Sequence, residues 1–276
     1  FPKHMEKWEQ QEWKTAKLFV GQQKTFKLNN VDMSATIIGE NEDFLDDQKQ
    51  HPASLTFIFD NNIKDSDVDM TCAWDEIGKT NQDYWNSTIS DNLNSTSYVN
   101  WYAFNGDPTK QLTCHASVLS MLQDQNDDSA QYIKTLYRTV ITYDKYTVGH
   151  WKANQQNTKL FLPALSSLFS DQGIDDTVNK QDVPIRAVYT TDGAALLKQE
   201  DDQYTYYKQK IANGTADFNS LYPALSRTSG MCLCSPAIDM DQTNKYVETF
   251  EDFSGACLPR EAEVTNYYSF SPCFCF

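Results

Sequence analysis

Three aspartates at alternate positions, Asp65, Asp67 and Asp69, are the residues whose spacing points most sharply to chemistry. Carboxylates at such a spacing surround calcium in an EF-hand loop, which also needs one at its twelfth position, where Glu76 stands. The sixth position must be glycine for the sharp turn, but it is Met70, and the flanks are typical of strands, so the sequence excludes an EF-hand. A looser calcium site between strands stays a weak hypothesis. Its alternative is an acidic strand edge that discourages pairing with other chains.

Seven cysteines are the second group of reactive residues, and they are unevenly distributed. Cys72 and Cys114 stand alone in the first half of the chain. The other five crowd the last 45 residues: Cys232, Cys234, Cys257, Cys273 and Cys275. Residues two apart on a strand point to one face, so the two C-x-C pairs could meet across neighbouring strands. We expect a Cys72–Cys114 disulfide and two bridges among the last five, which leaves one cysteine without a partner in the chain.

Two other interpretations of the cysteines stay open. A tetrathiolate zinc site has two to four residues between paired ligands, and the C-x-C spacing is tighter than that. Reduced, buried thiols in a cytosolic protein are the third interpretation. A chain that begins at Phe1 rather than Met is typical of signal-peptide removal, with a truncated start as the alternative. We therefore expect disulfides and a secreted, extracellular protein.

Three N-x-S/T sequons lie at Asn86, Asn94 and Asn213. Their number is no greater than the composition predicts by chance, so their placement is the better guide. The first two lie in the polar stretch of residues 86–97, which we expect to be an exposed loop. In a protein secreted by a eukaryote, these asparagines would carry N-linked glycans.

The sequence holds no phosphate-binding loop and no G-x-S-x-G, H-E-x-x-H or G-x-G-x-x-G motif. Cys114 and His115 are not expected to act together, because consecutive side chains on a strand point to opposite faces. Six tryptophans and fifteen tyrosines among many amides and carboxylates are typical of surfaces that contact carbohydrate. Adjacent acids such as Glu251 and Asp252 could serve a glycosidase only if the fold sets two carboxyls across a cleft. Enzyme activity is therefore the less favoured class.

Composition disfavours two classes of partner. The 276 residues carry 23 basic and 38 acidic side chains, for a formal net charge of -15 and a pI near 4.6. Such a balance disfavours nucleic acid and anionic membrane surfaces, both of which attract lysine and arginine. The sequence has no run of about eighteen apolar residues and so predicts no membrane span.

These groups must be positioned by secondary structure, which begins with a predicted helix over residues 2–20. A proline suits its first turn and a glycine its end. Trp8, Trp13 and Phe19 fall on one broad apolar face of this helix. Such a face either docks on the parent domain or is offered to another subunit. We therefore separate residues 1–21 as an N-terminal arm.

The next region, residues 22–120, reads as short strands between turns rich in Asn and Asp, which is typical of an antiparallel sandwich. The predicted strands are 24–28, 34–38, 54–59, 68–74, 98–104 and 111–119. In the third region, residues 121–276, we predict helices at 129–141, 162–169, 202–212 and 217–225, and strands at 185–190, 231–234 and 264–270. β-Branched residues at 139–142 weaken the first of these helices. The expected fold class is α+β, an N-terminal antiparallel β-sandwich-like region with a mixed α/β C-terminal region, stapled by disulfides.

The sequence leaves two main functional hypotheses of different classes, beside a third, a cell-surface or secreted binding module that acts alone as a monomer. The first is a secreted glycoprotein that serves as a structural subunit of an extracellular assembly or filament and self-associates through its N-terminal arm. The second is a secreted carbohydrate-binding protein or glycoside hydrolase, which would show an exposed row of tryptophans or two carboxylates facing across a cleft. No cofactor other than calcium is expected.

Overall fold

The computed structural model describes residues 19–74, 84–103, 110–123, 131–143, 151–164, 166–168, 203–210, 231–238, 245–253, 256–263 and 267–276. These residues form mainly strands with a few short helices, in agreement with the expected α+β class. The predicted helix 217–225, the predicted strand 185–190 and residues 2–18 of the predicted helix 2–20 lie outside the described residues. The last two residues of that helix, 19 and 20, form a bend and a turn.

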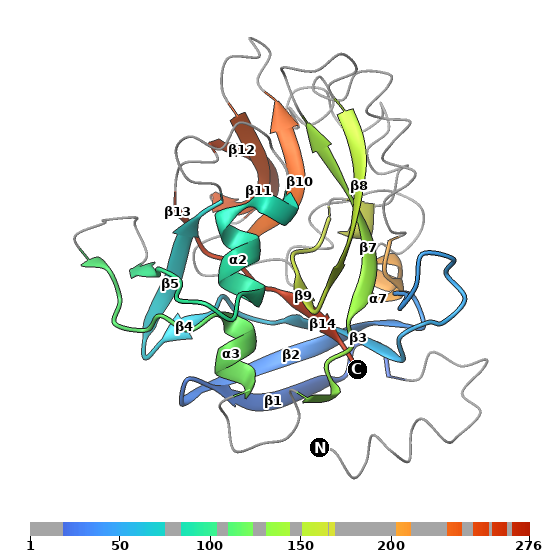
Figure 1. The fold of residues 1–276 in the computed structure, drawn as a ribbon, viewed down its shortest axis with the longest axis horizontal. Coiled ribbons are helices and arrows are strands. Elements are labelled where there is room, and N and C mark those ends of the chain that lie inside the picture. Colours follow the sequence, from blue (N-terminus) through green and yellow to red (C-terminus); the bar gives the residue numbers. More distant parts are fainter. Residues whose placement is uncertain are drawn as a thin grey trace.

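The largest sheet has five strands and lies across the lower part of the molecule in Figure 1. Its order is β1 (Gln23–Leu28), β2 (Val31–Glu40), β3 (Leu55–Phe59), β14 (Cys273–Cys275) and β9 (Leu160–Phe161), with every neighbouring pair antiparallel. Asn29 and Asn30 join β1 to β2, both at positive φ, a conformation that suits a tight turn matching the twist of the strands. The predictions at 24–28, 34–38 and 54–59 are confirmed.

Strand β14 comes from the end of the sequence and yet lies inside this sheet, between β3 and β9. The ring of Phe274 stacks on Phe57 with centroids 5.2 Å apart and meets Phe59 and Phe276 edge-on. All side chains of residues 269–276 are buried. Backbone pairing and aromatic packing therefore anchor the segment for which we expected a disulfide staple.

Three smaller sheets complete the fold. The first contains β5 (Val68–Ala73), β4 (Lys64–Asp65), β6 (Tyr102–Ala103) and β13 (Tyr267–Tyr268). The second is the hairpin of β7 (Leu136–Tyr143) and β8 (Trp151–Thr158). The third contains β10 (Met231–Ile238), β11 (Lys245–Phe253) and β12 (Ala256–Glu263). β13 and β14 both join strands from the first third of the chain, so these sheets cross the expected boundary near residue 120.

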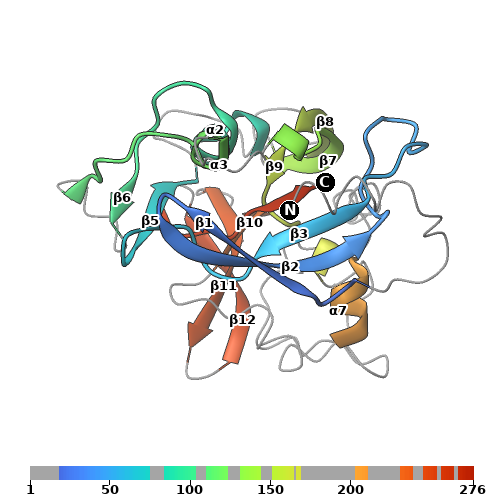
Figure 2. The ribbon, with the colours of Figure 1, turned by 90° about the horizontal axis from the view of Figure 1, so that it is seen from below.

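The helices are short, namely η1 (Tyr84–Asn86), α2 (Thr88–Asn94), α3 (Val118–Gln123) and α7 (Thr205–Lys210). Figures 1 and 2 show α2 and α3 beside each other on one side of the main sheet, while α7 packs against β2. The prediction of a helix within 202–212 is confirmed. No helix in the described part of the chain has the length and apolar character needed to cross a bilayer.

Several predicted elements are wrong. The expected helix at 129–141 contains instead the start of β7, because its β-branched residues favour a strand and β8 pairs with it from Leu136 to Tyr143. The expected strand at 111–119 does not form: Gln111 makes an isolated bridge with Tyr102, and α3 begins at Val118. The expected loop at 86–97 contains α2, where Ile89 and Leu93, four residues apart, are both buried.

The disulfide staple is not supported: the six described cysteine side chains, which exclude Cys257, form no disulfide. Cys72 lies on β5, β6 pairs with β5, and the segment that carries Cys114 lies beyond β6. Two strand spacings amount to roughly 9–10 Å, more than a disulfide can bridge. Cys273 and Cys275 on β14 likewise face strands other than β10, which holds Cys232 and Cys234.

Candidate ligand-binding site

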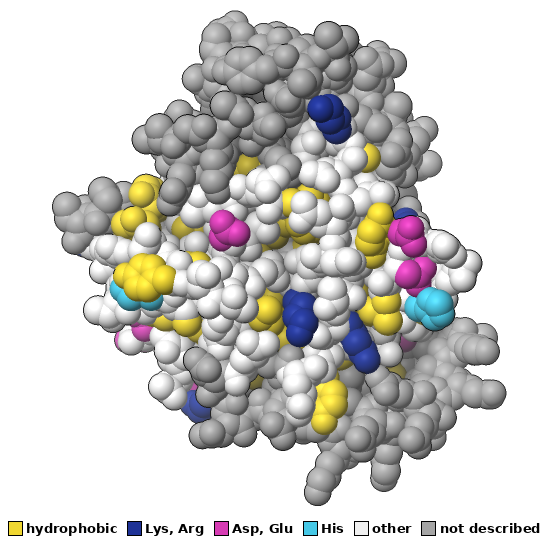
Figure 3. Space-filling model, in the orientation of Figure 1, with side chains coloured by type: hydrophobic (Ala, Val, Ile, Leu, Met, Phe, Trp, Pro, Cys, Tyr) yellow, Lys and Arg dark blue, Asp and Glu magenta, His cyan; other side chains and the backbone are white. Residues whose placement is uncertain are grey.

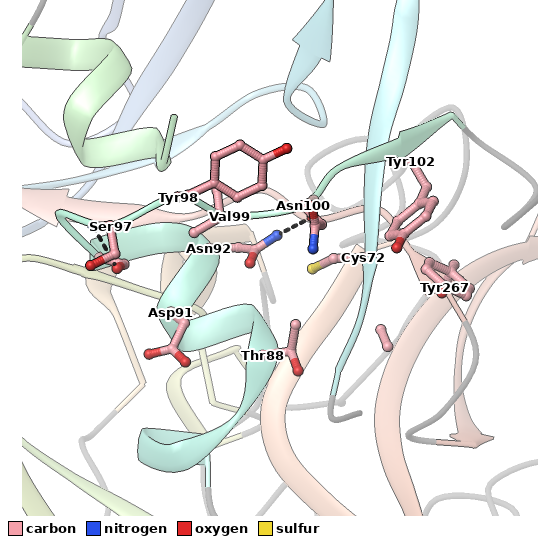
Figure 4. Close-up of a pocket in the computed structure, with 12 residues that line it drawn as sticks. Cys72, Thr88, Asp91, Asn92, Ser97, Tyr98, Val99, Asn100, Tyr102 and Tyr267 are labelled. Carbon is pink, nitrogen blue, oxygen red and sulfur yellow. Dashed lines mark hydrogen bonds between the residues drawn. The ribbon is translucent and has the colours of Figure 1, made fainter. Parts of the chain in front are cut away.

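A cavity of about 390 Å³ lies between α2 and the small sheet around β5. That volume falls within the range of small-molecule sites. Figure 4 shows its arrangement: α2 forms one wall, the Cys72 thiol points toward the centre, and Tyr102 and Tyr267 lie together at one end. Segments far apart in the sequence therefore meet at this one hollow.

A second wall is an extended segment, residues 98–103, whose side chains alternate. Val99 and Trp101 point into the core, at 6% and 0% exposed. The Val99 N–H donates to the His115 carbonyl at 3.0 Å, and the Trp101 carbonyl accepts from the Leu112 N–H at 2.8 Å. Residues 112–115 bond to one edge of the segment and β5 pairs with the other. The segment thereby presents Tyr98, Asn100 and Tyr102 to the cavity.

Helix α2 supplies a polar wall. Ser87 caps its first turn by accepting a hydrogen bond from the Ser90 N–H at 3.2 Å. With the apolar face of the helix buried, Thr88 and Asp91, three residues apart, line the cavity, and Ser95 follows at the end of the helix. A short run of residues thus anchors the helix and presents two hydroxyls and a carboxylate.

Tyr98 is the most exposed large hydrophobic side chain in the described residues, at 67%. Its ring stacks on His115 with centroids 4.0 Å apart and an interplanar angle of 21°. The His115 Nδ1 lies 3.1 Å from the Val99 carbonyl, which only accepts, so Nδ1 carries the proton and donates to it. In the neutral imidazole, Nε2 then accepts a hydrogen bond from the Tyr98 hydroxyl at 2.7 Å. One face of the Tyr98 ring is therefore covered by His115.

Fixed hydrogen bonds also orient the amides near the centre of the cavity. The Asn92 Nδ2 donates to the Asn100 carbonyl at 2.8 Å, a bond drawn in Figure 4. The Gln111 Nε2 donates to the Asn100 Oδ1 at 2.5 Å. At the end of the cavity, the rings of Tyr102 and Tyr267 meet edge-on with centroids 4.7 Å apart. These contacts hold the polar and aromatic lining in place without a ligand.

Asp91 is the only charged residue among the described residues that line the cavity. Its side chain is exposed, and its carboxylate makes no hydrogen bond or ion pair with the described part of the chain. The cavity thus combines aromatic rings, amides and hydroxyls with a single negative charge.

A second polar cluster is closed to ligands. The Arg138 guanidinium donates to Asp43, both side chains are 1% exposed, and the Tyr204 hydroxyl lies 3.0 Å from both oxygens of Asp43. Thr56 donates to the Asp43 Oδ2 at 2.5 Å, and the Cys275 thiol lies 3.5 Å from the same oxygen.

The same cluster joins five segments of the fold: the residues after β2, then β3, β7, β14 and the start of α7. Burial, followed by the charge of Asp43, raises the pKa of the Cys275 thiol well above its ordinary value. This thiol therefore stays protonated and is a poor nucleophile. We interpret the cluster as structural.

The three aspartates predicted to hold calcium do not converge. Asp65 accepts a hydrogen bond from Asn29 at 3.0 Å, Asp69 pairs with Lys64 at 3.7 Å, and Asp67 lies in the two-residue turn between β4 and β5. In the described residues no group of three acidic, histidine or cysteine side chains is arranged to hold a metal ion. The acidic pairs considered for hydrolysis lie outside the described side chains.

The predicted glycosylation and interface residues are placed unevenly. Asn86 is exposed, whereas the Asn94 amide donates to the Leu160 carbonyl at 2.8 Å and accepts from the Leu160 N–H at 2.9 Å. Phe19 packs against the core of its own chain, and its N–H donates to Glu40. The remaining residues of these two predictions, Asn213, Trp8 and Trp13, lie outside the described residues.

Sequence reasoning missed the whole cavity. Tyr98, Asn100 and Tyr102 alternate with buried residues, a signal that was readable as a strand with a polar and aromatic outer face. Tyr267 and Asp91 have no such local signal, because their role depends on β13 pairing with β5 and on α2 forming beside them. Comparison of the chain with family models, curated proteins and solved structures finds no match.

Proposed function

We propose that this protein binds a small carbohydrate in the cavity between α2 and β5. The observation that carries the proposal is Tyr98, whose exposed ring is backed by His115 beside a lining of amides and hydroxyls. Sugar rings present apolar C–H faces that pack on aromatic rings, and their hydroxyls need donors and acceptors at fixed positions. The cavity offers both kinds of group.

The geometry supports binding rather than hydrolysis. A glycosidase of the usual kind needs two carboxyl groups across the scissile bond, roughly 5–10 Å apart. The lining residues that the structure describes include one carboxylate, that of Asp91. We therefore propose a carbohydrate-binding protein and keep secretion and N-glycosylation at Asn86 as parts of this proposal.

The assembly hypothesis gains less support. On the face shown in Figure 3, the coloured hydrophobic side chains form separate small patches instead of one continuous surface. A broad apolar patch is what usually marks an interface. Self-association through the N-terminal arm stays a prediction, with the oligomeric state of the native protein as its test.

The experiment is calorimetric titration of the protein with simple monosaccharides and their methyl glycosides. Tyr98→Ala should weaken binding at least tenfold, which corresponds to about 1.4 kcal/mol, because it removes the aromatic platform. Tyr137→Ala is the matched control, since Tyr137 lies on β7 away from the cavity and bonds to Gln155. Equal losses in the two variants, or no binding of any sugar by the native protein, would contradict the proposal.

A further inference from the structure

We infer that the sugar bound in this cavity is an amino sugar whose protonated amine pairs with Asp91. This inference rests on the proposed function and adds the chemical class of the ligand. It starts from the charge of the described lining residues, which include one carboxylate and no lysine or arginine. A cavity of that sign favours cations over anions at short range.

The Asp91 carboxylate is available to a ligand. Aspartates elsewhere in the described chain, such as Asp43, Asp65 and Asp69, have partners within the protein, but Asp91 has none there. Its position in the first turn of α2 suits a negative charge, because the N-terminus of a helix carries a partial positive charge. The fold therefore positions a carboxylate at the rim of the cavity without pairing it with a group in the described chain.

The other lining groups suit the same ligand. Figure 4 shows Asp91 and Ser97 toward one end of the cavity and Tyr102 and Tyr267 at the other, with Tyr98 above them. An ammonium group has three donors, which a carboxylate and serine hydroxyls can accept. Tyrosine rings attract cations through their faces and pack on the apolar side of the sugar.

The charge of the whole protein acts in the same direction. A formal net charge of -15 attracts cationic ligands and repels acidic sugars at long range. A neutral sugar still binds, because an exposed Asp91 keeps its bonds to water when no amine is present. The expected order of affinity is amino sugar, then neutral sugar, then uronic acid.

The test compares glucosamine, glucose and glucuronate as ligands of the full chain. The amine of glucosamine is taken to have the pKa of an α-amino group, about 7.7–8.0. Most of this amine is then protonated at pH 7, and only a small fraction is protonated at pH 9. Glucosamine should bind about fivefold more tightly than glucose at pH 7 and about as tightly as glucose at pH 9. The ratio of the two affinities at each pH is compared, because effects of pH on the protein itself act on both sugars and cancel.

Asp91→Asn keeps the shape of the side chain and removes its charge, so it should abolish the preference for glucosamine over glucose at pH 7, and the ratio of the two affinities is the quantity compared between variants. Asp47→Asn is the matched control, because it removes one exposed carboxylate outside the cavity and should keep the preference.

The native protein could bind glucosamine and glucose with equal affinity at pH 7, and Tyr98→Ala could still weaken the binding of both sugars. That result would overturn the amino-sugar inference and leave the proposed function standing. A preference that survives Asp91→Asn would overturn the inference too. If no sugar binds, the proposed function fails and the inference fails with it.

Discussion

Two aspartates of this chain show that the same type of side chain can have a structural role in one place and a binding role in another. Asp43 is 1% exposed, and an arginine, a tyrosine, a threonine and a thiol surround it. Asp91 is exposed, lines the same cavity as three tyrosines, and has no partner in the described chain. A buried carboxylate has to be fully paired to be tolerated, whereas an exposed one keeps its water and can exchange it for a ligand. The first kind of site orders the fold, and the second is available for function.

The largest effect should come from breaking the buried pair. Arg138→Met should lower the free energy of unfolding by about 3–5 kcal/mol, because it leaves the Asp43 charge buried without its main partner. The exposed pair of Lys27 and Asp32, with side chains 58% and 85% exposed, gives a matched control. Lys27→Met should cost less than about 1 kcal/mol. Urea denaturation measures both, and equal costs would show that the Asp43 cluster is not structural.

A second effect should appear at high pH. The folded state raises the pKa of the Cys275 thiol, so this thiol stays protonated when the unfolded chain begins to ionise above about pH 8.5. The unfolded state then binds fewer protons, and the free energy of unfolding falls by up to about 1.4 kcal/mol per pH unit for this thiol.

Unfolding by urea at a series of pH values measures this fall. Cys275→Ala should make it shallower between about pH 8.5 and pH 10. Cys114→Ala should change it less, because burial raises the pKa of that half-buried thiol to a lesser extent. Identical pH profiles for the native protein and Cys275→Ala would contradict the role given to the buried cluster.

A third effect, of similar size to the second, extends the comparison to two sequons. Asn94→Gln should lower the free energy of unfolding by about 1–3 kcal/mol, because the amide that bonds both backbone groups of Leu160 is displaced. Asn86→Gln, at an exposed position, should change it by less than about 0.5 kcal/mol. In protein from a eukaryotic host, peptide mass mapping should find a glycan at Asn86, and a glycan at Asn94 would contradict the bonded geometry of that side chain.

The sequence predicts the elements that local patterns control and misses those that distant contacts control. The alternating residues of β1, β2, β3 and β5 are visible in the sequence, and the structure confirms these strands. The pairing of Asp43 with Arg138, 95 residues apart in the chain, has no local signal. Cysteine spacing suggested disulfides across neighbouring strands, but β14 inserts between β3 and β9 instead of beside β10, so the strands that carry the two C-x-C pairs are not paired with each other.

The cavity was hidden for a related reason. Its aromatic wall can be read from the alternation at residues 98–102, but its other wall depends on α2, whose polar sequence resembles a loop. Only the cap at Ser87 and the apolar pair Ile89 and Leu93 mark that helix. Tyr267 joins the site through strand pairing alone.

The most direct test of the carbohydrate site is an NMR titration of isotopically labelled protein with glucosamine at pH 7. Binding in the cavity predicts that the amide signals of residues 91–102 and of Tyr267 shift with saturation, while those around Asp43 and Arg138 stay in place. Shifts confined to other parts of the molecule, or no saturable shifts at millimolar sugar, would contradict it.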